Sequence, residues 1–485
     1  MAQSRRKFLQ QTGCALTGAA LVASLDQLNL ISAMAQTSDV ASDYRALVCI
    51  FLSGGNDCNN TIIPLDSEYN SYSSVRSTAQ LALSQQVLLP ISPISGRQFG
   101  LHPNLSPEVA NPTTTFKGLL DLWNQQKLAV LCNVGTLVQP LTRTQYQSGT
   151  GRPYQLFSHS DQVAQQQASI SNNPSQTGWG GRVADFTGAL NGIVPLPMNV
   201  SVAGTSLFAT GQTSRQLAIS PAPTSLNQVL VLNMFGGTLS DQQARRNTFA
   251  QLLGFDLDRA LIKASSDTTN QALSTSAALS SSQQDVVTAF PNTSLGNQLK
   301  QVARLMKFRD TLGMKRQIFF CTLGGFDTHT QQTGSSPTST AGGAAGSGNQ
   351  GSLLFQLSTA MRAFYDETVA QNIQNNVVTF TLSDFGRTFQ PSGSGSGTVG
   401  SDHAWGNHAF IMGGAIHGGD FYGKYPTLAL GGPDDTDNRG RWIPSTSIDQ
   451  YAATLATWYG LAQSDLPTVF PFLSRFPSSN LGFLG

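Results

Sequence analysis

Residues 46–57 read Ala46-Leu-Val-Cys-Ile-Phe-Leu-Ser-Gly-Gly-Asn-Asp57, an apolar run that stops at two glycines and an aspartate. A short continuous apolar run is typical of a strand that is buried on both faces of a parallel sheet. The glycines allow a tight turn after the run and a close approach of the backbone to a ligand. This stretch therefore predicts a buried strand that delivers Asp57 to its carboxyl end.

Two more runs have the same form. Gln317-Ile-Phe-Phe-Cys-Thr322 leads into Gly324-Gly-Phe-Asp-Thr-His329, and Asn376-Val-Val-Thr-Phe-Thr381 leads into Leu382-Ser-Asp-Phe-Gly-Arg-Thr388. A fourth motif, Ser401-Asp-His-Ala-Trp-Gly-Asn-His408, instead precedes a strand-like run. In an open α/β sheet, ligands bind at the carboxyl ends of the strands. We therefore expect the acids and histidines of the four motifs to converge on one site.

Segments with helical spacing of apolar residues separate these runs, and the alternation predicts a mostly parallel sheet covered by helices on both faces. The helical segments are 116–123, 299–312, 353–373 and 448–459, and 127–132 reads as another strand.

The middle of the chain differs from this pattern. Residues 190–296 contain β-like stretches followed by a polar segment, which predict an inserted antiparallel element or cap with a solvated helix and loop. Two segments rich in Gly and Ser, 334–352 and 392–400, follow motifs and predict mobile loops at the rim of the site.

Residues 1–35 have the anatomy of a twin-arginine leader. Ser4-Arg-Arg-Lys-Phe-Leu9 precedes a weakly apolar stretch, and Ala33-Met-Ala35 forms a small-x-small cleavage site. The alternative is an N-terminal amphipathic helix that carries two arginines. The order and spacing of the three parts favour export of the folded chain by the twin-arginine translocase. We expect a mature protein that begins near Gln36 and is periplasmic or extracellular.

The composition excludes two classes of partner. Removing residues 1–35 turns 28 basic and 27 acidic residues into 25 and 26, because this segment holds three basic residues and one acidic residue. A nearly neutral chain lacks the basic footprint of nucleic-acid binding. No later stretch approaches the ~20 apolar residues of a membrane-spanning helix. Four cysteines remain, and their spacing does not require disulfides.

Carboxylates and imidazoles are ligands that suit Zn²⁺ and other divalent ions. The candidate metal ligands are Asp57, Asp327, His329, Asp384 and His403. Residues two apart in an extended chain point to the same side, so we expect the side chains of Asp327 and His329 to do so. The structural alternatives are that Asp57 forms a turn and that Asp384 forms an ion pair within its loop.

Two residues are candidate catalytic groups. Arg387 follows the third strand, where a guanidinium is able to bind phosphate or sulfate through two hydrogen bonds. Ser158 precedes the helix-like segment 162–168, and the N-terminus of a helix stabilises an anionic nucleophile. The same position also suits a serine that only caps the helix.

The motifs resemble those of the domain of unknown function 1501 family. Besides the leader and the four motifs, the resemblance includes Phe99-Gly-Leu-His-Pro103, Ser158-His159 and Gly413-Gly-Ala-Ile-His-Gly-Gly419. That family is grouped with the alkaline phosphatase and sulfatase superfamily. The resemblance implies an alkaline phosphatase-like α/β/α sandwich over residues 36–485, metals at the strand ends and hydrolysis of phosphate or sulfate esters. Phe385 stands where the superfamily's Asp-His-Gly motif has histidine, so a second metal site lacks one ligand.

The resulting hypothesis is an exported hydrolase of small-molecule or polymer phosphate or sulfate esters. It depends on Zn, Mn or Ca at the strand ends, with a water or Ser158 as the attacking group. Its rival is a non-catalytic exported protein that keeps the fold for binding or for assembling cell-surface material. Phe385 and the unmatched nucleophile favour the rival, since a fold alone does not establish an activity.

Overall fold

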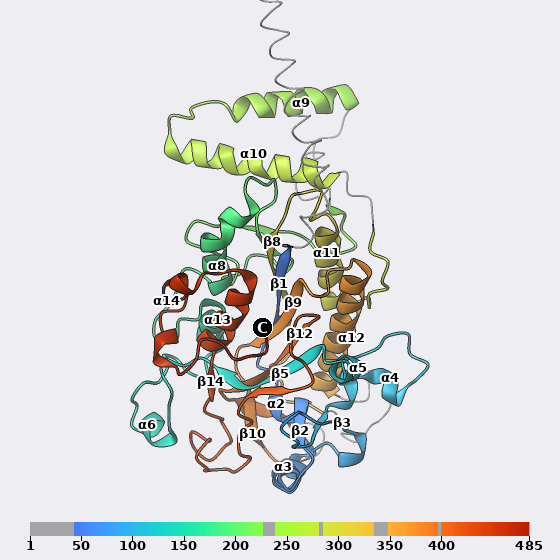
Figure 1. The fold of residues 1–485 in the computed structure, drawn as a ribbon, viewed down its shortest axis with the longest axis vertical. Coiled ribbons are helices and arrows are strands. Elements are labelled where there is room, and N and C mark those ends of the chain that lie inside the picture. Colours follow the sequence, from blue (N-terminus) through green and yellow to red (C-terminus); the bar gives the residue numbers. More distant parts are fainter. Residues whose placement is uncertain (1–42, 227–237, 281–284, 334–347, 396–398, 485) are drawn as a thin grey trace, which may run out of the picture.

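A mixed, mostly parallel sheet organises the chain (Figure 1). The computed structural model describes residues 43–226, 238–280, 285–333, 348–395 and 399–484, so the predicted leader lies outside the described residues. The strand order is β13-β5-β12-β9-β1-β8-β6-β7, and β14 pairs with β5. The strands are β1 (Arg45–Leu52), β5 (Leu128–Gly135), β6 (Asn199–Ser201), β7 (Gln216–Ala218), β8 (Arg316–Leu323), β9 (Val377–Ser383), β12 (Asn407–Gly413), β13 (Phe421–Gly423) and β14 (Thr446–Ser447).

The three strands that precede the first three motifs are neighbours in this sheet. β1 pairs in parallel with β8, ending with Leu52 opposite Leu323, and with β9, ending with Leu52 opposite Ser383. Their carboxyl ends therefore meet at one edge, as predicted. β12 runs antiparallel to β9 and β5, so the motif before it reaches the same edge. The topology delivers all four motifs to one place.

Side chains of β1 alternate between two apolar layers, because successive residues of a strand point to opposite faces. Val48 and Ile50 pack into a core formed with α11 (Ser294–Lys307) and α12 (Gly348–Ala370). Leu47, Cys49 and Phe51 face the opposite core. The helices of that second layer are α8 (Trp179–Thr187), α13 (Ile448–Tyr459) and α14 (Leu466–Val469). This confirms the predicted sheet with helices on both faces.

Smaller elements surround the site edge. β10 (Arg387–Pro391) and β11 (Ser401–His403) form an antiparallel pair, and β2 (Ile62–Pro64), β4 (Phe99–Leu101) and β3 (Leu89–Ile91) form a three-stranded sheet. Short helices include α2 (Cys58–Thr61), α3 (Glu68–Arg76), α5 (Leu120–Asn124) and α7 (His159–Ala168). Of the predicted rim loops, 334–347 and 396–398 lie outside the described residues, whereas 348–352 form the first turns of α12.

In the middle of the chain, the described strands do not pair as predicted, and residues 227–237, which include one of the predicted β-like stretches, lie outside the described residues. β6 pairs in parallel with β8, and β7 pairs in parallel with β6, so these strands extend the central sheet instead of forming an antiparallel insert. The sequence indicates β-like character in this region, but strands of three residues do not specify their partner or its direction. α9 (Leu239–Leu252) and α10 (Ala260–Ser280) lie beyond the end of the sandwich (Figure 1).

Replacing Gly54 tests the close contact between the loops that follow β1 and β8. A Cβ at Gly54 would lie 2.3 Å from the Asp327 nitrogen, at a φ of +113°. Gly96 is the matched control, because its φ is +81° but a Cβ there meets nothing within 4 Å. We expect Gly96→Ala to lower the free energy of unfolding by about 1 kcal/mol, from the left-handed backbone alone. Gly54→Ala should lower it by about 3 kcal/mol or more in urea denaturation, because a clash is added. Equal losses would contradict the close approach.

Candidate metal centre

Asp384 and His159 join the end of β9 to the first residue of α7. The Asp384 side chain is 1% exposed, and its Oδ1 accepts a hydrogen bond of 3.1 Å from the Gly54 nitrogen. Its Oδ2 lies 2.7 Å from His159 Nδ1. Burial raises the pKa of Asp384, although the hydrogen bond with His159 opposes this change. A carboxylate in this position fixes both the orientation of the imidazole and the nitrogen that carries its proton.

Two other imidazoles are anchored in the same manner. His329 Nδ1 lies 3.1 Å from Asp402 Oδ1, and His403 Nδ1 lies 2.7 Å from the carbonyl oxygen of Phe157. A carbonyl oxygen only accepts hydrogen bonds, so Nδ1 of His403 must carry the proton. The carboxylates favour the same arrangement in the other two rings. In their neutral forms, all three rings therefore present the lone pair of Nε2.

The three Nε2 atoms converge on one carboxylate oxygen. Asp327 Oδ1 lies 3.1 Å from Nε2 of His329, 3.4 Å from Nε2 of His159 and 3.7 Å from Nε2 of His403. The Nε2 atoms of His329 and His403 are only 2.9 Å apart. Two lone pairs at this distance repel each other unless a proton or a cation lies between them.

These distances fit the size of a metal ion. Zn–N and Zn–O bonds of about 2.0–2.1 Å place tetrahedral ligand atoms about 3.3 Å apart. The ligand atoms of His159, Asp327 and His403 all lie within 4.8 Å of one another, and His329 contacts two of these three residues. The side chain of Asp327 is 49% exposed, so the group is open to solvent. The donor set is three imidazoles and one carboxylate.

Arg387 does not have the predicted role of binding an anion. Its side chain is fully buried, and it donates hydrogen bonds to the carbonyl oxygens of Gly54, Gly55, Phe326 and Ser401. It also forms an ion pair with Asp327. Burial alone would raise the pKa of Asp327, but the hydrogen bond and charge of Arg387 outweigh this and lower it. Arg387 thus holds a charged carboxylate in place.

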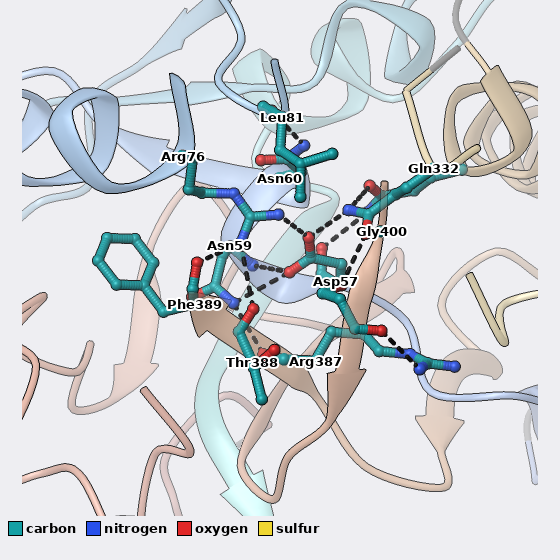
Figure 2. Close-up of polar contacts among 12 residues, drawn as sticks. Asp57, Asn59, Asn60, Arg76, Leu81, Gln332, Arg387, Thr388, Phe389 and Gly400 are labelled. Atoms are coloured by element: carbon teal, nitrogen blue, oxygen red, sulfur yellow. Dashed lines mark hydrogen bonds and ion pairs between the residues drawn. The ribbon is translucent and has the colours of Figure 1, made fainter. Parts of the chain in front are cut away.

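Asp57 is held apart from the histidines. Its buried carboxylate pairs with Arg76 and accepts hydrogen bonds from Asn59 and Gln332 (Figure 2). Arg76 also donates to the carbonyl oxygens of Thr388 and Phe389 on β10, the strand that begins with Arg387. The structure thus corrects the prediction that Asp57 is a ligand, because its lone pairs are already committed to these partners. Asp57 also caps α2, in line with its alternative as a turn residue.

Ser158 precedes α7 as predicted, but its hydroxyl forms hydrogen bonds within α7. Its Oγ donates to Asp161 Oδ2 and lies 3.2 Å from Ser160 Oγ. The residue of this motif that faces Asp327 is instead His159, which was not predicted to be a site residue. The signal was available, since the chain has only six histidines and His159 stands at the start of a helix. The contact of Asp402 with His329 was likewise not predicted.

Charge and burial keep His403 able to act as a ligand. Burial lowers the pKa of His403, and the nearby charges of His159, Arg387 and His329 lower it further, against the hydrogen bond with Phe157. A lowered pKa keeps the ring neutral, which is the form that binds metal. For Asp402, burial raises the pKa, but Arg439 and His329 outweigh it and keep the carboxylate charged. His408 lies elsewhere, buried and accepting a hydrogen bond from the Asn133 nitrogen.

The fold and site define an α/β protein with a histidine- and aspartate-rich group at the carboxyl edge of its sheet. The chain belongs to the DUF1501 family, which is described as proteins of unknown function and whose sequence profile matches residues 44–436. This agrees with the family that the motifs resemble. No curated protein matches the sequence.

Two solved structures show remote similarity. A sulfatase, PsFucS1 from Pseudoalteromonas sp., has 9% identity and a TM-score of 0.31, with 95% of this chain and 74% of the other covered. A mutant of the alkaline phosphatase PafA has 11% identity and a TM-score of 0.21, with 71% of this chain and 64% of the other covered.

Replacing Asp57 separates the buried ion pair from the candidate metal ligands. We expect Asp57→Asn to lower the free energy of unfolding by about 3–5 kcal/mol, because it leaves the buried charge of Arg76 without a counterion. Asp66→Asn, which breaks an exposed pair with Arg97, should cost about 1 kcal/mol or less. Denaturant unfolding measures both, and metal content per folded chain should be unchanged in each. Loss of metal with unchanged stability would restore Asp57 as a ligand.

Proposed function

We propose that this protein is an exported metal-dependent hydrolase of phosphate or sulfate esters. The observation that carries the proposal is the convergence of three Nε2 atoms on Asp327 Oδ1, with each Nδ1 held by an acceptor. Hydrogen bonds from a second layer of residues are a feature of protein metal sites. Three imidazole lone pairs directed at one carboxylate oxygen repel it unless a proton or a cation lies between them.

His159, Asp327, His329 and His403 would hold the ion. Imidazole-rich sites suit Zn or Mn better than Ca, which prefers oxygen ligands, so Ca is the least favoured of the three metals considered. A bound divalent ion supplies a Lewis acid and lowers the pKa of a coordinated water. Asp384, Asp402 and the Phe157 carbonyl orient the imidazoles, and Arg387 keeps Asp327 ionised and in position.

The charges at the rim favour an anionic substrate. Arg439 pairs with Asp402, and Arg441 donates from Nε to the carbonyl oxygen of His403 at 2.9 Å. The guanidinium of Arg441 also lies 4.6 Å from the ring centre of Phe157, which fixes its direction. Arg441 also pairs with Asp437. With a divalent ion present, the charges of the ion and of Arg387, Arg439 and Arg441 still exceed those of the four aspartates, which are Asp327, Asp384, Asp402 and Asp437. Arg439 and Arg441 therefore replace Arg387 as the proposed contacts for a phosphate or sulfate group.

Export remains part of the proposal. Its support is the leader at residues 1–35, together with four cysteines that are all buried and unpaired. A protein that folds before translocation reaches an oxidising compartment with its thiols already covered. None of the helices within the described residues has the length and apolar character needed to cross a bilayer.

Metal analysis of the purified protein tests the centre. We expect ~1 equivalent of Zn or Mn per chain, and its loss in His159→Ala and Asp327→Ala, because each removes one of four donors. His417→Ala is the control, since His417 is exposed and its Nδ1 lies 3.0 Å from the carbonyl oxygen of Gly482. Plasma mass spectrometry measures the metal, and assays with aryl phosphates and sulfates measure hydrolysis. A metal-free native protein would sink the proposal, and bound metal without hydrolysis would favour the non-catalytic rival.

Asp384→Asn tests the orienting role of the buried carboxylate. Asparagine has the same size as aspartate but no charge, so it no longer fixes the proton on Nδ1 of His159. We therefore expect metal affinity to fall about 10–100-fold with the fold retained. Competition with a chromophoric chelator measures the affinity, and circular dichroism checks the fold. If Asp384→Asn removed the metal as completely as Asp327→Ala, Asp384 would itself be a ligand, as the sequence predicted.

A further inference from the structure

A cavity of about 350 Å³ lies at the same edge of the sheet as the candidate metal centre. It opens between the carboxyl ends of β1 and β8, one face of α7, and the loop after β6. Ser160, Val163, Ala164 and Gln167 line it at the spacing of adjacent turns of a helix. The cavity is at the lower end of the range of about 300–1,000 Å³ for small-molecule sites.

The cavity adjoins the metal group at two points of the chain. Ser160 lines the cavity, and the preceding residue, His159, directs Nε2 toward Asp327. Ser53 lines it as well, and the next residue, Gly54, donates its N–H to Asp384. Consecutive Cα atoms are about 3.8 Å apart, so at both points the two spaces are bordered by neighbouring residues of the chain. A substrate held at the metal group would extend its remaining part into this cavity.

The lining of the cavity is polar but uncharged. Among the described residues that form it, none is acidic or basic. Phe51 and Phe320 provide an aromatic floor, while Ser53 and Thr205 have side-chain hydroxyls with no hydrogen bond to any described residue. An ionised group placed there would lose water without gaining a counterion. A neutral group with an apolar ring and hydroxyls would lose little and gain contacts.

We propose that this cavity binds the alcohol portion of the ester, and that it selects an uncharged, ring-sized alcohol over a charged one. The inference rests on the proposed hydrolase function, because that function supplies the ester. It goes further in dividing the site into an anion end, at the metal group and Arg441, and a neutral end, at Ser53, Ser160 and Thr205.

The test compares neutral and anionic ligands of the same size. Binding of 4-nitrobenzyl alcohol and 4-nitrobenzoate to the metal-loaded full chain is measured by equilibrium dialysis. Hydrolysis of 4-nitrobenzyl phosphate and 4-carboxybenzyl phosphate is measured in parallel, with the corresponding sulfates. We expect the neutral member of each pair to be favoured by about tenfold or more.

A charge placed in the cavity should change this preference. Thr205→Lys adds a cation at an exposed lining position, so the anionic member should bind better and the preference should narrow or reverse. Thr115→Lys makes the same substitution at an exposed threonine outside the cavity and should leave the preference unchanged. Both positions are on the surface, which makes a folding defect easy to recognise by its melting curve.

The outcomes separate the two proposals. Hydrolysis with no preference for the neutral ester, or a preference that Thr205→Lys leaves unchanged, overturns the cavity assignment while the hydrolase stands. Absence of hydrolysis together with selective, Thr205-dependent binding of the alcohol overturns the hydrolase while the cavity assignment stands. If neither the alcohol nor the carboxylate binds, the cavity assignment is wrong.

Discussion

The buried guanidinium of Arg387 is the interaction on which the site depends. It binds carbonyl oxygens of the loop after β1, the loop after β8 and the first residue of β11, and it pairs with Asp327. Those segments come from distant parts of the chain and share only the edge of the sheet. A fully buried cation is costly to desolvate, so it persists only where many acceptors and an opposite charge surround it. The hydrogen bonds and the ion pair of Arg387 therefore hold these loops in one arrangement.

A second buried pair supports the first. Arg76 binds Asp57 and the carbonyl oxygens of Thr388 and Phe389, which fixes the start of β10, where Arg387 stands. The side chains of Asp57, Arg76 and Arg387 are fully buried, whereas Asp327 is 49% exposed. Of the two aspartates, Asp327 is the one that contacts the histidines. This explains how two strand-end aspartates of similar sequence context have different roles, one structural and the other at the site.

The sequence is sufficient to predict the sheet but only part of the site. β1, β8 and β9 follow from continuous apolar runs, and α13 matches the helical segment at 448–459, because burial and periodicity are local signals. Asp327, His329 and His403 meet as predicted, since parallel strands bring their ends together. His159 was missed because its place depends on how α7 packs over the sheet.

Long-range partners account for the other corrections. Asp57 is committed to Gln332, 275 positions away along the chain, and such a partner leaves no trace in the residues around Asp57. The role of Arg387 was also mispredicted, because its acceptors are backbone carbonyl oxygens, which every residue provides. β6 lies in a stretch that was predicted to be β-like, but its parallel pairing with β8 was not predicted, and the three residues of β7 do not define a periodicity. The errors therefore concern partners and short elements, while the assignment of long buried elements holds.

The 2.9 Å separation between Nε2 of His329 and Nε2 of His403 brings two imidazole lone pairs together. With both Nδ1 atoms engaged by acceptors, the pair relieves its repulsion only by sharing a proton or by binding a cation. Under the proposed function, a metal ion bound there would take the place of that proton. Acidity in the surroundings competes directly with metal loading. A chain that folds and loads its metal in the near-neutral cytoplasm would avoid that competition.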